Sequence, residues 1–131
     1  MAKIKANEAL VKALQAWDID HLYGIPGDSI DAVVDSLRTV RDQFKFYHVR
    51  HEEVASLAAG SYTKMTGKIG VALSIGGPGL VHLLNGMYDA KMDKVPQLIL
   101  SGQTNSTLLG TKAFQETNLS KLCEDVAVYN H

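Results

Sequence analysis

Residues Val49–Met65 read VRHEEVASLAAGSYTKM and join an apolar run to an alanine-rich segment. The apolar run, residues 44–49, is typical of a buried strand, and the segment after it is typical of a helix. Glu52 then falls in the first helical turn at the carboxyl end of a strand, the edge of an open parallel sheet where ligands bind. The helix dipole favours a carboxylate there. The local pattern leaves two readings of Glu52 and Glu53: groups that act on a ligand, or ordinary first-turn acids.

Strands and helices alternate on both sides of this stretch. We expect helices at residues 7–17, 30–37, 52–66 and 80–92, and strands at residues 21–25, 44–49, 69–75 and 97–102. Asp28 or Ser29 is the expected cap of the second helix, Gly67 ends the third, and Val126–Tyr129 is a candidate last strand. This alternation predicts an α/β fold: a three-layer α/β/α sandwich with a doubly wound, mostly parallel sheet, as in flavodoxin-like proteins.

Length, charge and cysteine content exclude several classes of protein. A chain of 131 residues predicts one domain, residues 1–131, with a real core. A formal net charge of −1 gives no electrostatic case for binding nucleic acid. Cys123 is the single cysteine, so no internal disulfide is expected and the thiol is read as a packing group. With no apolar signal-peptide core near Met1, the expected location is the cytoplasm.

Three loops gather at the carboxyl ends of the expected strands: Gly24–Asp28, Arg50–Glu53 and Ser74–Gly79. Glycines in such loops let a backbone approach a ligand closely. The third loop reads GGPG, which is neither a dinucleotide fingerprint nor a phosphate loop. Pro78 also removes one of the N–H donors that a phosphate would need. A ligand-binding edge and a set of tight turns both remain open on spacing alone.

Four short motifs follow one another along the chain. They are GIPG at Gly24–Gly27, VRHEE at Val49–Glu53, GGPG with HLLNGMYDA within Gly76–Ala90, and AFQE at Ala113–Glu116. Together they resemble the pyrimidine-binding, N-terminal domain of thiamine-diphosphate enzymes, most closely the pyruvate oxidase branch with its bacterial quinone-linked, acetate-forming members. Acetolactate synthases are similar, but they usually read R-H-E-Q where this chain has R-H-E-E. The resemblance covers essentially the whole chain.

The resemblance implies a catalytic role for Glu52. In this family the matching glutamate hydrogen-bonds a ring nitrogen of the cofactor's aminopyrimidine and shares a proton with it, which favours the imino tautomer. That task needs a carboxyl group that is buried, exchanges a proton near neutral pH and touches no lysine or arginine. Because glutamine cannot relay a proton, we expect Glu52→Gln to lower the activity of an intact enzyme by orders of magnitude without disturbing the fold.

Other residues receive roles from the same resemblance. Those expected to line the pyrimidine slot by backbone and shape are Pro26, Gly27, Gly77, Pro78 and Gly79. Phe114 and Gln115 match residues near the substrate, although such a pair is also a common loop anchor. His51 either orients Glu52 or faces a neighbouring subunit. His82 lies in an apolar helical stretch, so we expect a packed histidine there rather than an acid–base group.

The implied cofactor is thiamine diphosphate, and the implied substrate is pyruvate, which leaves as acetate or acetyl phosphate and CO2. The chain contains no G-D-G motif for the diphosphate and its Mg2+ and no middle domain for FAD, so both groups are expected only in an intact enzyme. No metal-ligand set is expected in this chain. It should therefore be a fragment that supplies half a site, binds the cofactor weakly if at all, and does not turn over pyruvate alone.

The expected assembly is a homodimer or homotetramer formed through the pyrimidine domain. Contact with a quinone or with the inner membrane face is expected of the intact enzyme only. Two rival classes fit the same alternation of elements. A non-catalytic flavodoxin-like module would hold a nucleotide at Gly76–Gly79 and leave Glu52 solvated, whereas a structural or regulatory paralogue would dimerise through the Glu52 helix without cofactor.

Overall fold

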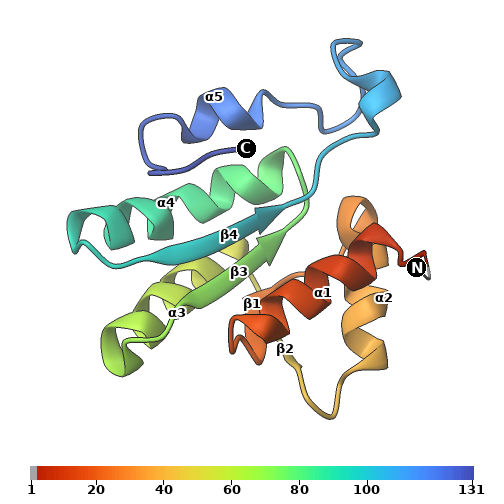
Figure 1. The fold of residues 1–131 in the computed structure, drawn as a ribbon. Coiled ribbons are helices and arrows are strands. Elements are labelled where there is room, and N and C mark those ends of the chain that lie inside the picture. Colours follow the sequence, from red (N-terminus) through yellow and green to blue (C-terminus); the bar gives the residue numbers. More distant parts are fainter. Residues whose placement is uncertain (1–2) are drawn as a thin grey trace.

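The computed structural model describes residues 3–131, so residues 1 and 2 of the predicted domain lie outside the described part (Figure 1). The strands are β1 (His21–Gly24), β2 (Lys45–His48), β3 (Gly70–Ser74) and β4 (Gln97–Ser101). The helices are α1 (Ala6–Ala16), α2 (Asp31–Thr39), α3 (Glu52–Thr66), α4 (Pro78–Met92) and α5 (Leu119–Cys123), with short 3-10 turns η1 (Asp28–Ile30) and η2 (Ser106–Leu108). The predicted α/β class is confirmed, and each expected helix and strand through residue 102 is present within a few residues of its expected ends.

The strands form one parallel sheet in the order β2-β1-β3-β4. From β1 the chain passes to β2 on one side and then crosses to β3 on the other. The carboxyl ends of β1 and β3 therefore flank the point where the winding direction reverses, which is where open α/β sheets bind ligands. β3 is buried at all five of its residues, as expected of a central parallel strand.

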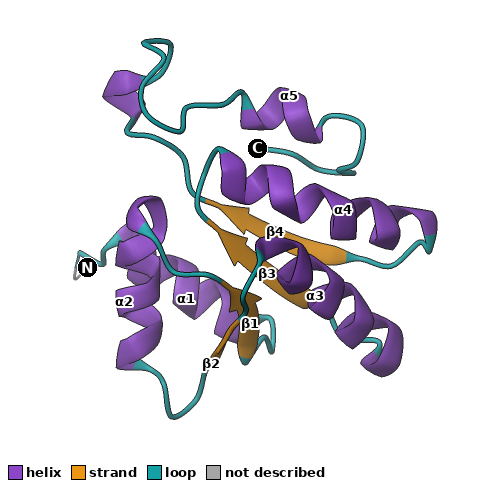
Figure 2. Ribbon diagram, turned by 180° about the vertical axis from the view of Figure 1, so that it is seen from behind, coloured by secondary structure: helices purple, strands orange, loops and turns teal. Residues whose placement is uncertain are grey.

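Helices cover both faces of the sheet (Figures 1 and 2). On one face α1 and α2 pack over a core that includes Leu22, Phe44 and Val71. On the other face α3 and α4 enclose a second core around Ala59 and Leu83, and α5 lies against α4. The predicted three-layer sandwich is thus confirmed, with one apolar core on each side of the sheet.

Two local predictions are wrong. Val126–Tyr129 is not a strand: Val126 is buried in the second core, but Val128 and Tyr129 are exposed, and no strand among residues 3–131 pairs with them. Neither Asp28 nor Ser29 caps the second helix through its side chain. The hydroxyl of Ser29 instead accepts a hydrogen bond from the backbone N–H of Gly76 at 3.1 Å, because the fold brings those two loops together.

The third helix keeps its predicted end. α3 stops at Thr66, and Gly67 takes the left-handed conformation with φ of 73°.

Among the described residues, none of the helices combines the length and the apolar character that crossing a bilayer requires.

Candidate functional site

Glu52 is the first residue of α3, and its side chain is only 13% exposed. It sits where the strand β2 gives way to the helix, as the sequence predicted. Its carboxylate oxygen Oε2 lies 2.8 Å from Nδ1 of His82, the fifth residue of α4. Within residues 3–131 Glu52 forms no ion pair with a lysine or arginine. The carboxyl group therefore meets the requirement of shelter from water without a neutralising cation.

The second oxygen of Glu52, Oε1, makes no hydrogen bond to any described residue. No side-chain oxygen in that part of the chain is both fully buried and unpartnered. Oε1 therefore still touches solvent, and an incoming molecule can reach it. A carboxyl group with one oxygen fixed and the other free is suited to sharing a proton with a ligand nitrogen.

Histidines surround Glu52 on two sides. His51 is the N-cap of α3, and its Nδ1 accepts a hydrogen bond from the N–H of Glu53 at 3.3 Å. The rings of His51 and His82 stack with 4.4 Å between centroids and an interplanar angle of 29°. The expectation of a packed His82 is wrong: its side chain is 44% exposed and faces Glu52. The tertiary contact between α3 and α4 overrides the apolar neighbours of His82 in the sequence.

The neighbouring acid, Glu53, has a different partner. Its carboxylate accepts a hydrogen bond from the side-chain amide of Asn85 on α4. Asn85 follows His82 by three residues, so both lie on the helix face that turns toward α3. Sequence reasoning did not single out Asn85. The spacing of a histidine and an asparagine on one helix face was the available signal, but their acidic partners lie 30 or more residues away in the chain.

The glycine-containing loops meet at the carboxyl end of the sheet. Gly27 is packed against Ile75, where a Cβ would come within 2.6 Å of a side-chain methyl. Gly77 has φ of 58°, and its Cα faces the backbone carbonyl of Gln115, where a Cβ would come within 2.4 Å. Gly79 is buried against Ile75 and Ser74. The loops after β1 and β3 and the segment of Gln115 are thus drawn together, as a shared cradle requires.

The remaining predicted residues differ in their exposure to solvent. Pro26 and Pro78 are exposed, and Pro78 opens α4 at a position where a missing N–H costs nothing. Phe114 is 87% exposed, whereas Gln115 is half-buried with φ of 61°. The structure brings Gln115 to Gly77 but gives Phe114 no packing, so Phe114 is not an anchor of its loop.

These residues fit a heterocyclic cofactor that offers a ring nitrogen to a carboxyl group. The accessible oxygen of Glu52 and the closely packed backbones at Gly27 and Gly77 are the observations that support this fit. A divalent ion has candidate ligands too: one donor atom each from His51, Glu52 and His82 lies within 4.8 Å of the others. A mostly apolar groove of about 1140 Å³ lies elsewhere, between β4, α5 and residues 126–131, and Glu52 is not among its lining residues.

Comparison with known proteins agrees with this geometry. The family described as "Thiamine pyrophosphate enzyme, N-terminal TPP binding domain" matches residues 4–122. YdaP of Bacillus subtilis, whose name assigns it thiamine pyrophosphate but no reaction, is 55% identical over 99% of this chain and 23% of its own. A pyruvate oxidase of Lactiplantibacillus plantarum is 50% identical over 97% of this chain and 21% of its own.

A more distant relative, an acetolactate synthase of Mycobacterium leprae, is 35% identical over 98% of this chain and 20% of its own. The chain thus spans between a fifth and a quarter of the length of these curated relatives. The match of residues 4–122, the parallel α/β sandwich and the sheltered glutamate agree with one another. This chain belongs to the N-terminal, thiamine-pyrophosphate-binding domain family of thiamine pyrophosphate enzymes.

Proposed function

We propose that this chain is the cofactor-activating domain of a pyruvate oxidase, which decarboxylates pyruvate oxidatively to acetate or acetyl phosphate and CO2. The observation that carries the proposal is the state of Glu52: sheltered, free of cationic neighbours other than histidine, and with one oxygen available. The choice of an oxidase is supported by 50% identity to a pyruvate oxidase, against 35% to an acetolactate synthase.

When bound, thiamine diphosphate supplies the carbon nucleophile and electron sink that decarboxylation of a 2-keto acid needs. Glu52 contributes by holding a proton at Oε1 and exchanging it with a ring nitrogen. His82 keeps the carboxyl group oriented through Oε2. Pro26, Gly27 and the Gly77–Gly79 turn contribute shape and backbone contacts rather than charge.

Several features belong to the proposal at the level of the intact enzyme. FAD and Mg2+ would be held by residues outside this chain, with FAD receiving the two electrons of the oxidation. The enzyme would act in the cytoplasm as a homodimer or homotetramer, with each pyrimidine domain completing a site on a neighbouring subunit. Phe114 and Gln115 would lie near the substrate, and the exposed ring of Phe114 is compatible with contact to another domain.

Substitution of Glu52 tests the proposed role. In a full-length protein that carries this domain, Glu52→Gln keeps the hydrogen bond to His82 but cannot exchange a proton, so turnover of pyruvate should fall by about 100-fold or more. The matched control is Glu53→Gln, which removes the same charge from the same helical turn and should retain most of the activity. Near-normal turnover in Glu52→Gln would refute the role of Glu52.

The runner-up is an acetolactate-synthase-type domain, which the 35% identity to the Mycobacterium leprae protein supports. The two reactions diverge after CO2 is released. An oxidase passes two electrons to an acceptor, whereas a synthase condenses the remaining two-carbon unit with a second 2-keto acid. Pyruvate-dependent reduction of a dye without acetolactate formation would support the oxidase, and acetolactate without dye reduction would support the synthase.

A further inference from the structure

We propose that Gln97, the first residue of β4, is a positioning residue that sets the spacing of α3 and α4 and so holds Glu52 in contact with His82. This inference rests on the proposed function for its catalytic consequence. The structural consequence, the Glu52–His82 contact, can be measured without any activity.

The two helices approach each other along a seam of residues spaced by one turn. On α3 these are Glu52, Ser56, Gly60 and Lys64, four residues apart. Their counterparts on α4 run from His82 through Gly86 to Asp89 and Asp93. At Gly86 the helices are so close that a Cβ would lie 2.6 Å from the Cβ of Ser56 and 2.7 Å from the backbone nitrogen of Leu57.

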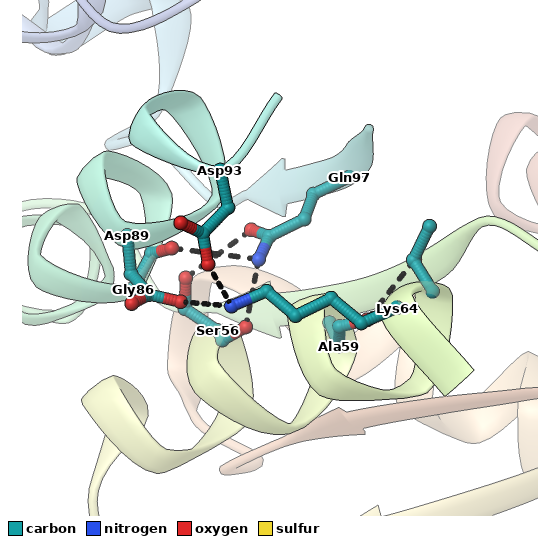
Figure 3. A network of polar contacts seen from close by, with 8 residues as sticks. Ser56, Ala59, Lys64, Gly86, Asp89, Asp93 and Gln97 are labelled. Carbon is teal, nitrogen blue, oxygen red and sulfur yellow. Dashed lines mark hydrogen bonds and ion pairs between the residues drawn. The ribbon is translucent and has the colours of Figure 1, made fainter. Parts of the chain in front are cut away.

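The side chain of Gln97 fills the middle of this seam (Figure 3). Its amide nitrogen Nε2 donates to the backbone carbonyl of Ser56 at 2.9 Å and to that of Gly86 at 3.4 Å. Its oxygen accepts from the hydroxyl of Ser56 at 3.3 Å. The carboxamide of Gln97, which lies on β4, therefore hydrogen-bonds to the backbones of both α3 and α4.

The space for this carboxamide is left by a glycine. A Cβ on Gly60 would lie 2.6 Å from Nε2 of Gln97, while the next side chain, Ala90, would be in ordinary contact at 3.9 Å. Gly60 is thus required for the amide of Gln97 rather than for the helix crossing. A larger residue there would expel the amide without wedging the helices apart directly.

The atoms that Gln97 holds lie one turn from the site. Ser56 follows Glu52 by four residues and Gly86 follows His82 by four, so each pair is stacked along its helix. Joining Ser56 to Gly86 therefore fixes the distance between the turns that carry Glu52 and His82. At the far end of the seam Lys64 bridges Asp89 and Asp93 at 2.9 and 2.6 Å, three turns from Glu52. Substitution of Lys64 therefore offers a matched control.

The tautomer of His82 reports on the contact. When the ring of His82 is neutral, Nδ1 can donate to the carboxylate of Glu52 only in the tautomer that carries the proton on Nδ1. In the 15N-labelled chain, at a pH where the spectrum itself shows a neutral His82 ring, nitrogen-detected NMR should show the Nδ1–H form in the wild type. Gln97→Met, which keeps the length but removes the hydrogen bonds, should lower the Nδ1–H population roughly twofold or more. Lys64→Met should leave it unchanged.

Gly60→Ala is a second test variant, which keeps the proposal testable if Gln97→Met does not fold. Alanine is a better helix former than glycine, yet it should expel the carboxamide and produce the same loss of the Nδ1–H form. Retention of that form in folded Gln97→Met or in Gly60→Ala would overturn the proposal. An equal loss in Lys64→Met would also overturn it, because any loosening of the seam would then suffice. The proposal would also be overturned if the neutral ring of His82 in the wild type carried its proton on Nε2.

The activity measurement separates this inference from the proposed function. In a full-length protein that carries the domain, Gln97→Met should lower kcat by about 10- to 100-fold, since small displacements of a reacting group are costly. If Glu52→Gln leaves turnover intact, the proposed function fails. The NMR measurement of the His82 tautomer would still test whether Gln97 positions Glu52 against His82.

Discussion

Replacing Gly86 by alanine should destabilise the chain even though alanine is the better helix former. Gly86 lies in α4 at its closest approach to α3. An added Cβ would meet the hydroxyl oxygen of Ser56 at 2.5 Å, its Cβ at 2.6 Å and the backbone nitrogen of Leu57 at 2.7 Å. Real Cβ atoms essentially never come so close, and two of these three atoms cannot rotate away. The helices must therefore separate.

The size of the effect follows from three terms. Overpacking of this kind costs about 1–3 kcal/mol, and rigid neighbours place it near the upper end. Stretching the bonds from Gln97 to the two helices adds about 1 kcal/mol. Higher helix propensity returns about 1 kcal/mol. The net loss in the free energy of unfolding should be about 2–3 kcal/mol.

Urea unfolding followed by circular dichroism measures this loss. Gly67→Ala is a matched control, because nothing lies within 4 Å of its Cβ and only the positive φ of 73° is strained. That control should lose about 1 kcal/mol. In a Ser56→Gly background two of the three clashes disappear, so Gly86→Ala should cost at least about 1 kcal/mol less there. A Gly86→Ala chain as stable as the wild type would refute the close approach of α3 and α4.

Three further predictions concern other residues of the chain. The backbone N–H of Gly110 lowers the pKa of Glu116 below its ordinary value. Because the pKa is lower in the folded state, the stability that this hydrogen bond contributes is complete above the unfolded-state pKa and is lost as the pH falls through the folded-state pKa. The NMR shift of the Gly110 amide should therefore titrate below about pH 4.3, and a higher midpoint would contradict the prediction. Burial raises the pKa of the Cys123 thiol, so a thiol reagent should react about tenfold faster or more once denaturant is added; equal rates would show that the thiol is accessible. Leu83 is fully buried, so Leu83→Ala should lower the free energy of unfolding by about 2–5 kcal/mol. Leu109 is exposed, so Leu109→Ala should change it by about 0.5 kcal/mol or less. Similar losses in the two variants would place Leu83 outside the core.

The elements predictable from sequence were those with a strong local signal. The uninterrupted apolar run of β3, the amphipathic stripe of α2 and the glycine that ends α3 each depend on neighbouring residues, and the structure confirms all three. The last predicted strand, Val126–Tyr129, is also mostly apolar, but no strand among residues 3–131 pairs with it: Val126 and Ala127 pack in the second core, whereas Val128 and Tyr129 are exposed. Composition alone cannot supply a neighbouring strand.

By itself the sequence determined the parallel α/β fold, the glutamate at the start of α3 and the glycine turns at one edge of the sheet, because periodicity and turn chemistry are local properties of the chain. Only the tertiary structure decided what Glu52 faces. It brought His82 to the carboxylate across 30 residues of chain, and it brought the side chain of Gln97 to Ser56 across 41. The physical reason is that packing two helices on one face of a sheet creates contacts that no local pattern encodes.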